Sequence, residues 1–315
     1  MKGNLGEKLQ SLPKPILYLI LILATSIPLF FPTEVPNEPV ESTKDFYATL
    51  MALPEGSKVL LMSDWTGSTR GESKGAFRSI FKILIRRKAK VAIYSAADPQ
   101  APRVAQDAIN ELNMERKRKN LPTFDRWNDW VNIGYFPNAE AAINGIANDL
   151  KGAFGGRKDF PPNSPPRDVF QSPVLQGVTK VEDFPLMLVI TASKTSNFAV
   201  ERVSGRTPLA FAVTGVMVPE TQVFYQSKQI VGYCGGLKGV YDLEQLMESG
   251  VNFPDKATGK IKSDKLGTIE GFPDPDNKGQ GTRYYPTLHY ALALMIIMII
   301  LGNVGMFLAK RGDKS

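Results

Sequence analysis

The sequence has little of the chemistry on which most enzyme classes depend. Its 315 residues include a single cysteine, Cys234, and a single histidine, His289. One cysteine excludes an intrachain disulfide and a cysteine metal cluster. One histidine inside an apolar run excludes a Ser-His-Asp triad or a histidine metal site in the central part of the chain. We therefore predict no bound metal and no cofactor, and the composition favours binding or assembly over catalysis.

Glycine motifs for nucleotides are also missing, since no stretch fits the dinucleotide fingerprint or the phosphate-binding P-loop. Residues 71–75 match the nucleophile-elbow pattern, and residues 79–82 match Ser-x-x-Lys. The first lies past its strand and has no histidine to activate Ser73, and the second falls on an amphipathic helix. A hydrolase that uses a carboxylate or a lysine remains a third hypothesis behind the two developed below.

Two uncharged apolar runs are present, one over 16–31 and one close to the C-terminus. The second is long enough to cross the ~30 Å hydrocarbon core as a helix, and we predict a transmembrane helix over 286–309. The first is short and contains Pro28. It is either a transmembrane helix within residues 1–32 or a cleaved signal peptide. Basic residues lie on the terminal side of both runs, so we expect cytoplasmic termini, residues 310–315 included, and an extracytoplasmic (periplasmic or cell-surface) central domain.

The net charge of +7 does not indicate a nucleic acid partner. Part of it lies in the two tails, where it marks membrane topology. Two basic clusters of the central domain, 86–90 and 116–119, are predicted to be solvated helix ends, with contact to anionic lipid headgroups as the alternative. From the apolar runs we predict the lipid bilayer as a partner, and from the distribution of charge we predict no nucleic acid partner.

Between the apolar runs, short apolar stretches alternate with amphipathic ones. The former are typical of strands buried on both faces, and the latter carry apolar residues at helical spacing. This alternation predicts an α/β fold, with a doubly wound, mostly parallel sheet of five or six strands over residues 58–249. A linker at 33–57 precedes it, a stalk or loop at 250–285 follows it, and transmembrane helices flank the whole. The predicted strands are 58–63, 90–95, 130–135, 186–191, 209–214 and 230–233.

Polar and small residues follow several of the predicted strands. In doubly wound sheets, ligands bind outside the carboxyl ends of the strands, so we expect a small polar or anionic ligand there. Arg70 and Lys194 would supply positive charge, and helix N-termini would supply N–H groups. Alternatively, these residue types serve only turns and helix caps. The candidate ligand-binding residues are Asp64, Thr66, Ser68, Arg70, Asp98, Ser193, Lys194 and Thr195.

Gly302, Asn303 and Gly305 form an unusual cluster within the second apolar run. Small residues let two helix backbones approach closely, and an amide can form a hydrogen bond across the contact. We predict that these residues form a helix contact in the membrane, within a homo-oligomer or with other membrane proteins.

Two motifs, SDWTGSTRGE at 63–72 and QIVGYCGGLKG at 229–239, resemble those of prokaryotic two-span membrane proteins with a large extracytoplasmic α/β (Rossmann-like) domain. The resemblance implies a membrane-anchored domain and no particular activity. The polar loops are also similar, in architecture alone, to those of periplasmic sugar- or amino-acid-binding domains.

Two hypotheses of function follow from these features. The first is a non-enzymatic assembly or scaffold subunit of a membrane complex, which the two anchors and the small-residue helix face favour. The alternative is a sensor or solute-binding-like domain that binds a small polar ligand at its strand-end loops.

Overall fold

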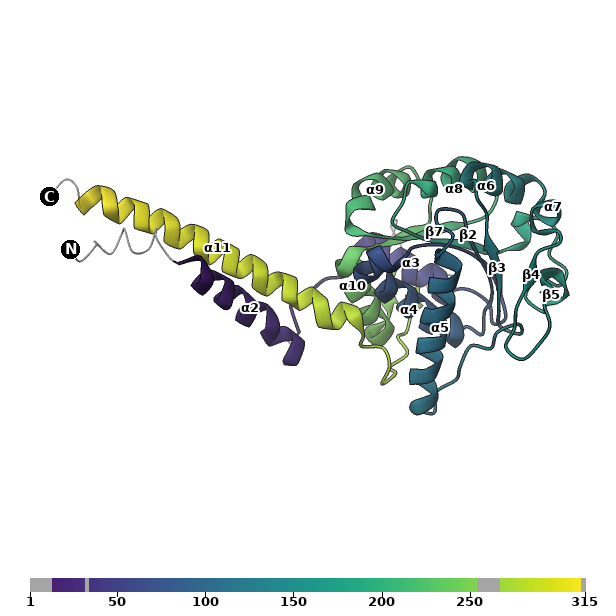
Figure 1. The fold of residues 1–315 in the computed structure, drawn as a ribbon, viewed down its shortest axis with the longest axis horizontal. Coiled ribbons are helices and arrows are strands. Elements are labelled where there is room, and N and C mark those ends of the chain that lie inside the picture. The colour runs from purple at the N-terminus through teal and green to yellow at the C-terminus, as the bar shows by residue number, and fades with distance from the viewer. Residues whose placement is uncertain (1–12, 32–33, 254–266, 313–315) are drawn as a thin grey trace. The chain divides into compact units, whose positions relative to one another are not determined.

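The computed structural model describes residues 13–31, 34–253 and 267–312, with residues 311 and 312 described by their backbone alone. The chain divides into two compact units, one of residues 38–281 and one of the residues on either side. The first unit contains a six-stranded sheet whose strand pairs are all parallel, with helices on both faces (Figure 1). The predicted α/β class and the Rossmann-like parallel sheet are therefore confirmed.

The strand order is β3-β2-β1-β6-β7-β8, so the order reverses between β1 and β6 as in doubly wound folds. Both neighbours of β1 run parallel to it, with Val59 opposite Val91 on one side and opposite Leu186 on the other. The strands are β1 (Lys58–Asp64), β2 (Lys90–Ser95), β3 (Trp130–Tyr135), β6 (Leu186–Thr191), β7 (Leu209–Val213) and β8 (Gly232–Gly235).

Helices cover both faces of the sheet and create two cores. In β1, Val59 and Leu61 lie in one core while Leu60 and Met62 lie in the other, because successive side chains of a strand point to opposite faces. In Figure 1 the two sets of helices lie above and below the sheet. The first core is covered by α3 (Glu41–Met51), α4 (Arg70–Arg86), α5 (Ala101–Arg118) and α10 (Gly236–Ser249), and the second by α6 (Ala139–Asn148), α7 (Leu150–Phe154), α8 (Thr195–Val203) and α9 (Val218–Gln226).

Helix α3 lies in the predicted linker but belongs to the folded unit, since Phe46, Tyr47 and Leu50 are fully buried. It packs directly on the edge strand β8. A Cβ atom on Gly232 of β8 would lie 2.4 Å from the backbone nitrogen of Phe46, so this contact is between the two backbones.

Two pairs of short strands and four 3-10 turns complete the elements of the described residues. Strands β4 (Lys158–Asp159) and β5 (Arg167–Asp168) form an antiparallel hairpin, and β9 (Val251–Asn252) pairs with β10 (Thr268–Ile269). The second pair carries the chain back onto the folded unit after residue 266, within the segment predicted to be a stalk. Single 3-10 turns lie at 67–69, 169–171, 181–183 and 215–217.

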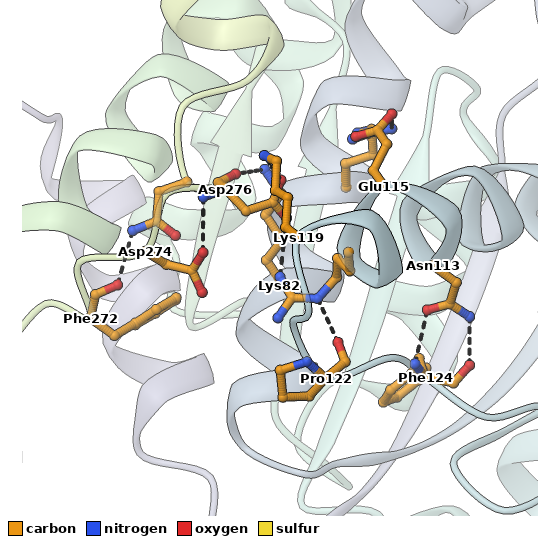
Figure 2. A network of polar contacts seen from close by, with 12 residues as sticks. Lys82, Asn113, Glu115, Lys119, Pro122, Phe124, Phe272, Asp274 and Asp276 are labelled. Carbon is orange, nitrogen blue, oxygen red and sulfur yellow. Dashed lines mark hydrogen bonds and ion pairs between the residues drawn. The ribbon is translucent and has the colours of Figure 1, made fainter.

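Asp276 holds this returning segment on α4 and α5 (Figure 2). Its buried carboxylate accepts hydrogen bonds from Arg116 Nη1 and Lys119 Nζ, each at 3.0 Å. The buried Lys82 donates to the Asp276 carbonyl, and burial lowers the pKa of the Lys82 ammonium against the opposing charges of Asp276 and Glu244. The predicted solvated cluster at 116–119 is therefore wrong for Arg116, which is buried because its partner lies 160 residues away in the sequence.

Two buried carboxylates of α10 fix the points where the chain enters and leaves the folded unit. Asp242 accepts the backbone N–H of Val40 at 3.1 Å. Glu244 accepts the backbone N–H of Gly279 at 3.1 Å and that of Gly281 at 2.9 Å. Both ends of the unit are thus attached to one helix.

The flanking unit contains two apolar helices, α2 (Lys14–Phe30) and α11 (Gln280–Gly312). Within α11, Gln280–Lys310 is long and apolar enough to cross a membrane. Helix α2 has 17 residues, fewer than the ~20 that a span usually needs. By length and composition, the structure supports the C-terminal span of the two that were predicted.

Candidate functional site

Asp64 ends β1 at the carboxyl edge of the sheet, beside the reversal of strand order. Its carboxylate is buried, and Oδ1 accepts hydrogen bonds from Ser95 Oγ at 2.7 Å, Ala96 N at 2.7 Å and Ala97 N at 3.2 Å. Thr195 Oγ1 donates to Oδ2 at 3.1 Å. One carboxylate therefore joins β1 to the segments that follow β2 and β6.

The surroundings of Asp64 define what its carboxylate can do. Burial raises the pKa of this carboxyl group above its ordinary value, and the hydrogen bonds from Ser95, Ala96, Ala97 and Thr195 oppose the shift. A carboxylate has about four acceptor sites, two on each oxygen. Three of the four donors bond to Oδ1 and only Thr195 bonds to Oδ2, so one acceptor site of Oδ2 has no donor among the described residues. In this geometry Oδ1 positions the loops, while Oδ2 can accept one more hydrogen bond without giving up an internal one.

Three more predicted residues precede or begin α4. Thr66 and Ser68 pair through their hydroxyl oxygens at 2.9 Å. The Arg70 guanidinium lies 3.1 Å from a Glu111 carboxylate oxygen of α5 and is more than half exposed. On the next loop, Asp98 Oδ1 accepts the backbone N–H two residues further on, at 2.7 Å. These contacts stabilise the loops locally.

The loop after β6 is organised by Thr191, whose Oγ1 accepts the Ser193 backbone N–H at 2.9 Å. Lys194 is exposed on this loop, and Thr195 begins α8. The structure thus brings Asp64 and Thr195 into direct contact, while the other predicted residues serve turns of their own loops or face solvent. Their role in ligand binding stays a prediction.

A second group lies at the same edge, around Glu72, which is not among the candidate ligand-binding residues predicted from the sequence. Its carboxylate accepts the Gly215 backbone N–H at 2.7 Å, and a Cβ on Gly236, whose φ is +57°, would lie 3.3 Å from Glu72 Oε2. Thr214, 6% exposed, has a buried Oγ1 with no hydrogen-bond partner among the described residues. The sequence feature that indicates this group is the glycine after each of β7 and β8, Gly215 and Gly236, because a residue without a side chain lets a carboxylate approach the backbone.

Within the described ranges, no group of three or more histidine, cysteine, aspartate or glutamate side chains is arranged to hold a metal ion.

A groove of about 630 Å³ lies at the opposite edge of the sheet, at the amino end of β3. Its walls come from the second half of α5, the loop before β3 and the β4–β5 hairpin, and none of the predicted site residues lines it. The groove is lined by Asn110, Asn113, Met114, Lys117, Thr123, Phe124, Asp125, Arg126, Trp127, Asn128, Trp130, Pro161, Pro162, Ser164 and Arg167.

Comparison of the chain with known protein families, with curated proteins and with solved structures found no match.

Proposed function

We propose that the chain is a membrane-anchored, extracytoplasmic α/β domain that acts as a non-enzymatic assembly or scaffold subunit of a membrane complex. The observation that carries the proposal is the attachment of both ends of the α/β unit to α10, through Asp242 and Glu244. A domain whose two ends leave from one helix is suited to tethering at one bilayer by both flanking helices.

In this proposal both flanking helices span the bilayer. The C-terminal helix has the required length and composition. Helix α2 is shorter, but Lys14 at its start has a long side chain that reaches the headgroup layer, and local thinning of the bilayer accommodates a modest mismatch. Lys310 and Arg311 follow the C-terminal run, so positive charge lies on the terminal side of both helices, as expected for cytoplasmic termini.

Assembly in this proposal uses the face of α11 that carries Gly302, Asn303 and Gly305. A Cβ on Gly302 would meet no described atom within 4 Å, which leaves space for a neighbouring backbone. Asn303 Nδ2 donates to the Ile299 carbonyl of its own helix at 2.9 Å. Its Oδ1 accepts no hydrogen bond within the described part of the chain and is suited to accept one from a second helix.

Native mass spectrometry of the full-length protein in mild detergent tests the proposal. We expect an oligomer for the unmodified chain and a shift to monomer for Gly302→Leu and Gly305→Leu, because a leucine side chain prevents close backbone approach. Val304→Leu is the matched control, since each residue turns the helix by roughly 100° and Val304 lies opposite the face. A protein that is monomeric without any substitution contradicts the assembly role.

A second candidate function is the binding of a small polar or anionic ligand at the carboxyl edge. The observation in its favour is the buried, unpartnered Thr214 hydroxyl at the edge that also presents the exposed Lys194. A thermal-shift screen with sugars, amino acids and phosphates is expected to raise the melting temperature for one class. The increase should be lost in Lys194→Gln, and a flat screen counts against this function.

A further inference from the structure

The groove at the amino end of β3 has walls that are fixed to each other. Arg126, from the loop before β3, pairs with Asp159 of β4 through Nη2 and Oδ1 at 2.6 Å, and Asp159 is fully buried. The Arg126 guanidinium also lies 5.2 Å from the ring centre of Trp130. The loop and the hairpin are therefore held in register, and the groove is already formed before any ligand enters it.

Trp127 occupies one wall of this groove in a backbone conformation that a bulky residue rarely adopts, with φ at +89°. Its backbone N–H donates to the Trp130 carbonyl at 2.7 Å, and the Arg167 guanidinium lies 5.4 Å from its ring centre. The indole is partly exposed, whereas Trp65 and Trp130 are each 1% exposed. Backbone strain of this kind persists only when the surrounding structure enforces it, and such residues are concentrated at ligand-binding and active sites.

The groove carries an excess of positive charge. Lys117 and Arg167 are exposed and form no ion pair among the described residues, whereas Arg126 is neutralised by Asp159. Among the described lining residues Asp125 is the acidic one, and its Oδ1 already accepts a hydrogen bond from a neighbouring amide at 2.7 Å. A ligand with negative charge is therefore favoured.

The lining also contains uncharged polar groups that can bind hydroxyls. The side chains of Asn110, Thr123 and Ser164 form no hydrogen bond among the described residues. By contrast, Asn113 exchanges two hydrogen bonds with the Phe124 backbone, at 2.7 and 2.9 Å, and so holds the wall in place. The groove thus combines an aromatic face, two cations and several groups that both donate and accept hydrogen bonds.

We propose that this groove binds an acidic saccharide. The sugar ring packs on the exposed part of the Trp127 indole, beside the Arg167 guanidinium. The sugar hydroxyls bond to Asn110 and its polar neighbours, and the sugar carboxylate pairs with Lys117 and Arg167. The volume of about 630 Å³ is in the usual range of small-ligand sites, about 300–1,000 Å³.

The position of the groove on α5 argues against a nucleotide or another phosphate-rich ligand. Asn113, Met114 and Lys117 belong to the last turns of α5, where the helix dipole places its negative end. Dense phosphate charge is disfavoured there, while a single carboxylate with many hydroxyls is penalised less. The site does not depend on the proposed assembly role, because one chain contains the whole groove.

Isothermal titration calorimetry of the full-length protein in mild detergent tests the proposal. The probes are galacturonate oligosaccharides, neutral maltose oligosaccharides of equal length, ATP and an oligoglutamate peptide. We expect saturable binding of the galacturonate series, weakened by added salt, with the neutral sugars at least about tenfold weaker. Trp127 is the partly exposed one of three tryptophans, so the same titration should change the intrinsic fluorescence.

Three variants locate the binding within the groove. Lys117→Gln and Arg167→Gln should each weaken galacturonate binding about tenfold or more, and Trp127→Gly should abolish the fluorescence change and weaken binding. Glycine relieves the positive φ but also removes the packing of the indole on the second core, so thermal melting of the glycine variant must show a folded protein at the temperature of the titration. Arg118→Gln, an exposed neighbour on α5 outside the groove, is the control and should bind normally.

Any of three results would overturn the proposal. The first is no saturable binding of galacturonate, and the second is binding of ATP or of the oligoglutamate peptide that is equally tight or tighter. The third is that the Lys117→Gln and Arg167→Gln variants bind galacturonate as well as Arg118→Gln does. The assembly role is read from the mass of the detergent-solubilised particle, so its failure and the failure of this site are distinguishable.

Discussion

Asp64 illustrates at the residue scale how a buried carboxylate organises a sheet edge. Replacing it with alanine leaves four donors, two of them backbone N–H groups, without an acceptor in a buried place. We expect Asp64→Ala to lower the free energy of unfolding by about 3 kcal/mol, the sum of several lost or unsatisfied hydrogen bonds. Thermal melting and denaturant titration of the full chain in detergent would measure the loss.

Asp64→Asn is the matched control for this prediction. The amide keeps an oxygen in the place of Oδ1 for its three donors, and its NH₂ group can donate to the Thr195 hydroxyl. We expect a change within about 1 kcal/mol. If the alanine variant is as stable as the asparagine variant, the carboxylate does not hold the loops together.

At the element scale, α3 and β8 are in contact through their backbones. An alanine Cβ at position 232 would meet the Phe46 backbone at 2.4 Å, which forces the helix away from the edge strand. Gly232→Ala should therefore destabilise the protein by roughly 3 kcal/mol, at the upper end of overpacking effects. Gly67→Ala, where a Cβ meets no described atom within 4 Å, should change stability by less than about 0.5 kcal/mol. Equal melting temperatures of the two variants would contradict this packing.

Asp276, in the returning segment, should make the stability of the protein depend on pH. Burial alone would raise the pKa of the Asp276 carboxyl, but Lys82, Lys119 and Arg116 together hold it below its ordinary value. A lowered folded-state pKa gives stability that is complete above the ordinary aspartate pKa of about 3.9 and is lost as the pH falls below it. Melting curves from about pH 3 to about pH 7 should show this acid loss for the unmodified protein.

Asp276→Asn tests whether this carboxylate causes the acid loss. At neutral pH the substitution leaves the buried Arg116 without its counter-charge and Lys82 with the charge of Glu244 alone, and we expect a loss of roughly 3 kcal/mol. The variant should also show a shallower acid decline. Asp107→Asn, which breaks an exposed pair with Arg103 on the same helix, should cost less than about 1 kcal/mol. A steep acid decline that persists in Asp276→Asn would assign the loss to other carboxylates.

The strands were predictable from the sequence because they are buried on both faces. The apolar runs 90–95 and 186–191 coincide with β2 and β6, because helices cover both faces of the sheet and the side chains on both sides of these strands are buried. The edge strand was predicted at 230–233 but runs over Gly232–Gly235. Its two glycines follow close contacts, of Gly232 with α3 and of Gly235 with Val218, rather than a hydrophobic pattern.

The sites were less predictable, because they depend on residues distant in the sequence. The strand-end loops were expected from parallel topology alone, but their internal hydrogen bonds were not, since Thr195 reaches Asp64 across 131 residues. The groove is formed by residues from 110–117, 123–130 and 161–167. The local spacing of apolar residues predicts helices and strands, but it does not show which distant segments lie together in the fold. The aromatic cluster around Trp127 was the available signal, but its strained backbone is visible only in the folded chain.

At the scale of the whole molecule, the two apolar helices and the shared attachment on α10 define the membrane topology to be tested. Cys234 makes the test simple, because it is the single cysteine and is fully buried. Burial raises the pKa of its thiol, with the nearby charges of Asp242 and Glu244 adding to the shift. A buried, protonated thiol does not react with maleimides, so the unmodified protein should show no background labelling.

A membrane-impermeant maleimide added to intact cells then reports on any cysteine introduced at the surface. Gln226→Cys, at the exposed end of α9, should label before permeabilisation, because the proposal places the α/β unit outside the cytoplasm. Ser315→Cys should label only after permeabilisation, because the terminal positive charges favour the cytoplasmic side. Protection of Gln226→Cys in intact cells would place the α/β unit in the cytoplasm. If both cysteines label in intact cells, the C-terminus also lies outside, and a cytoplasmic N-terminus would then be separated from it by an odd number of membrane spans.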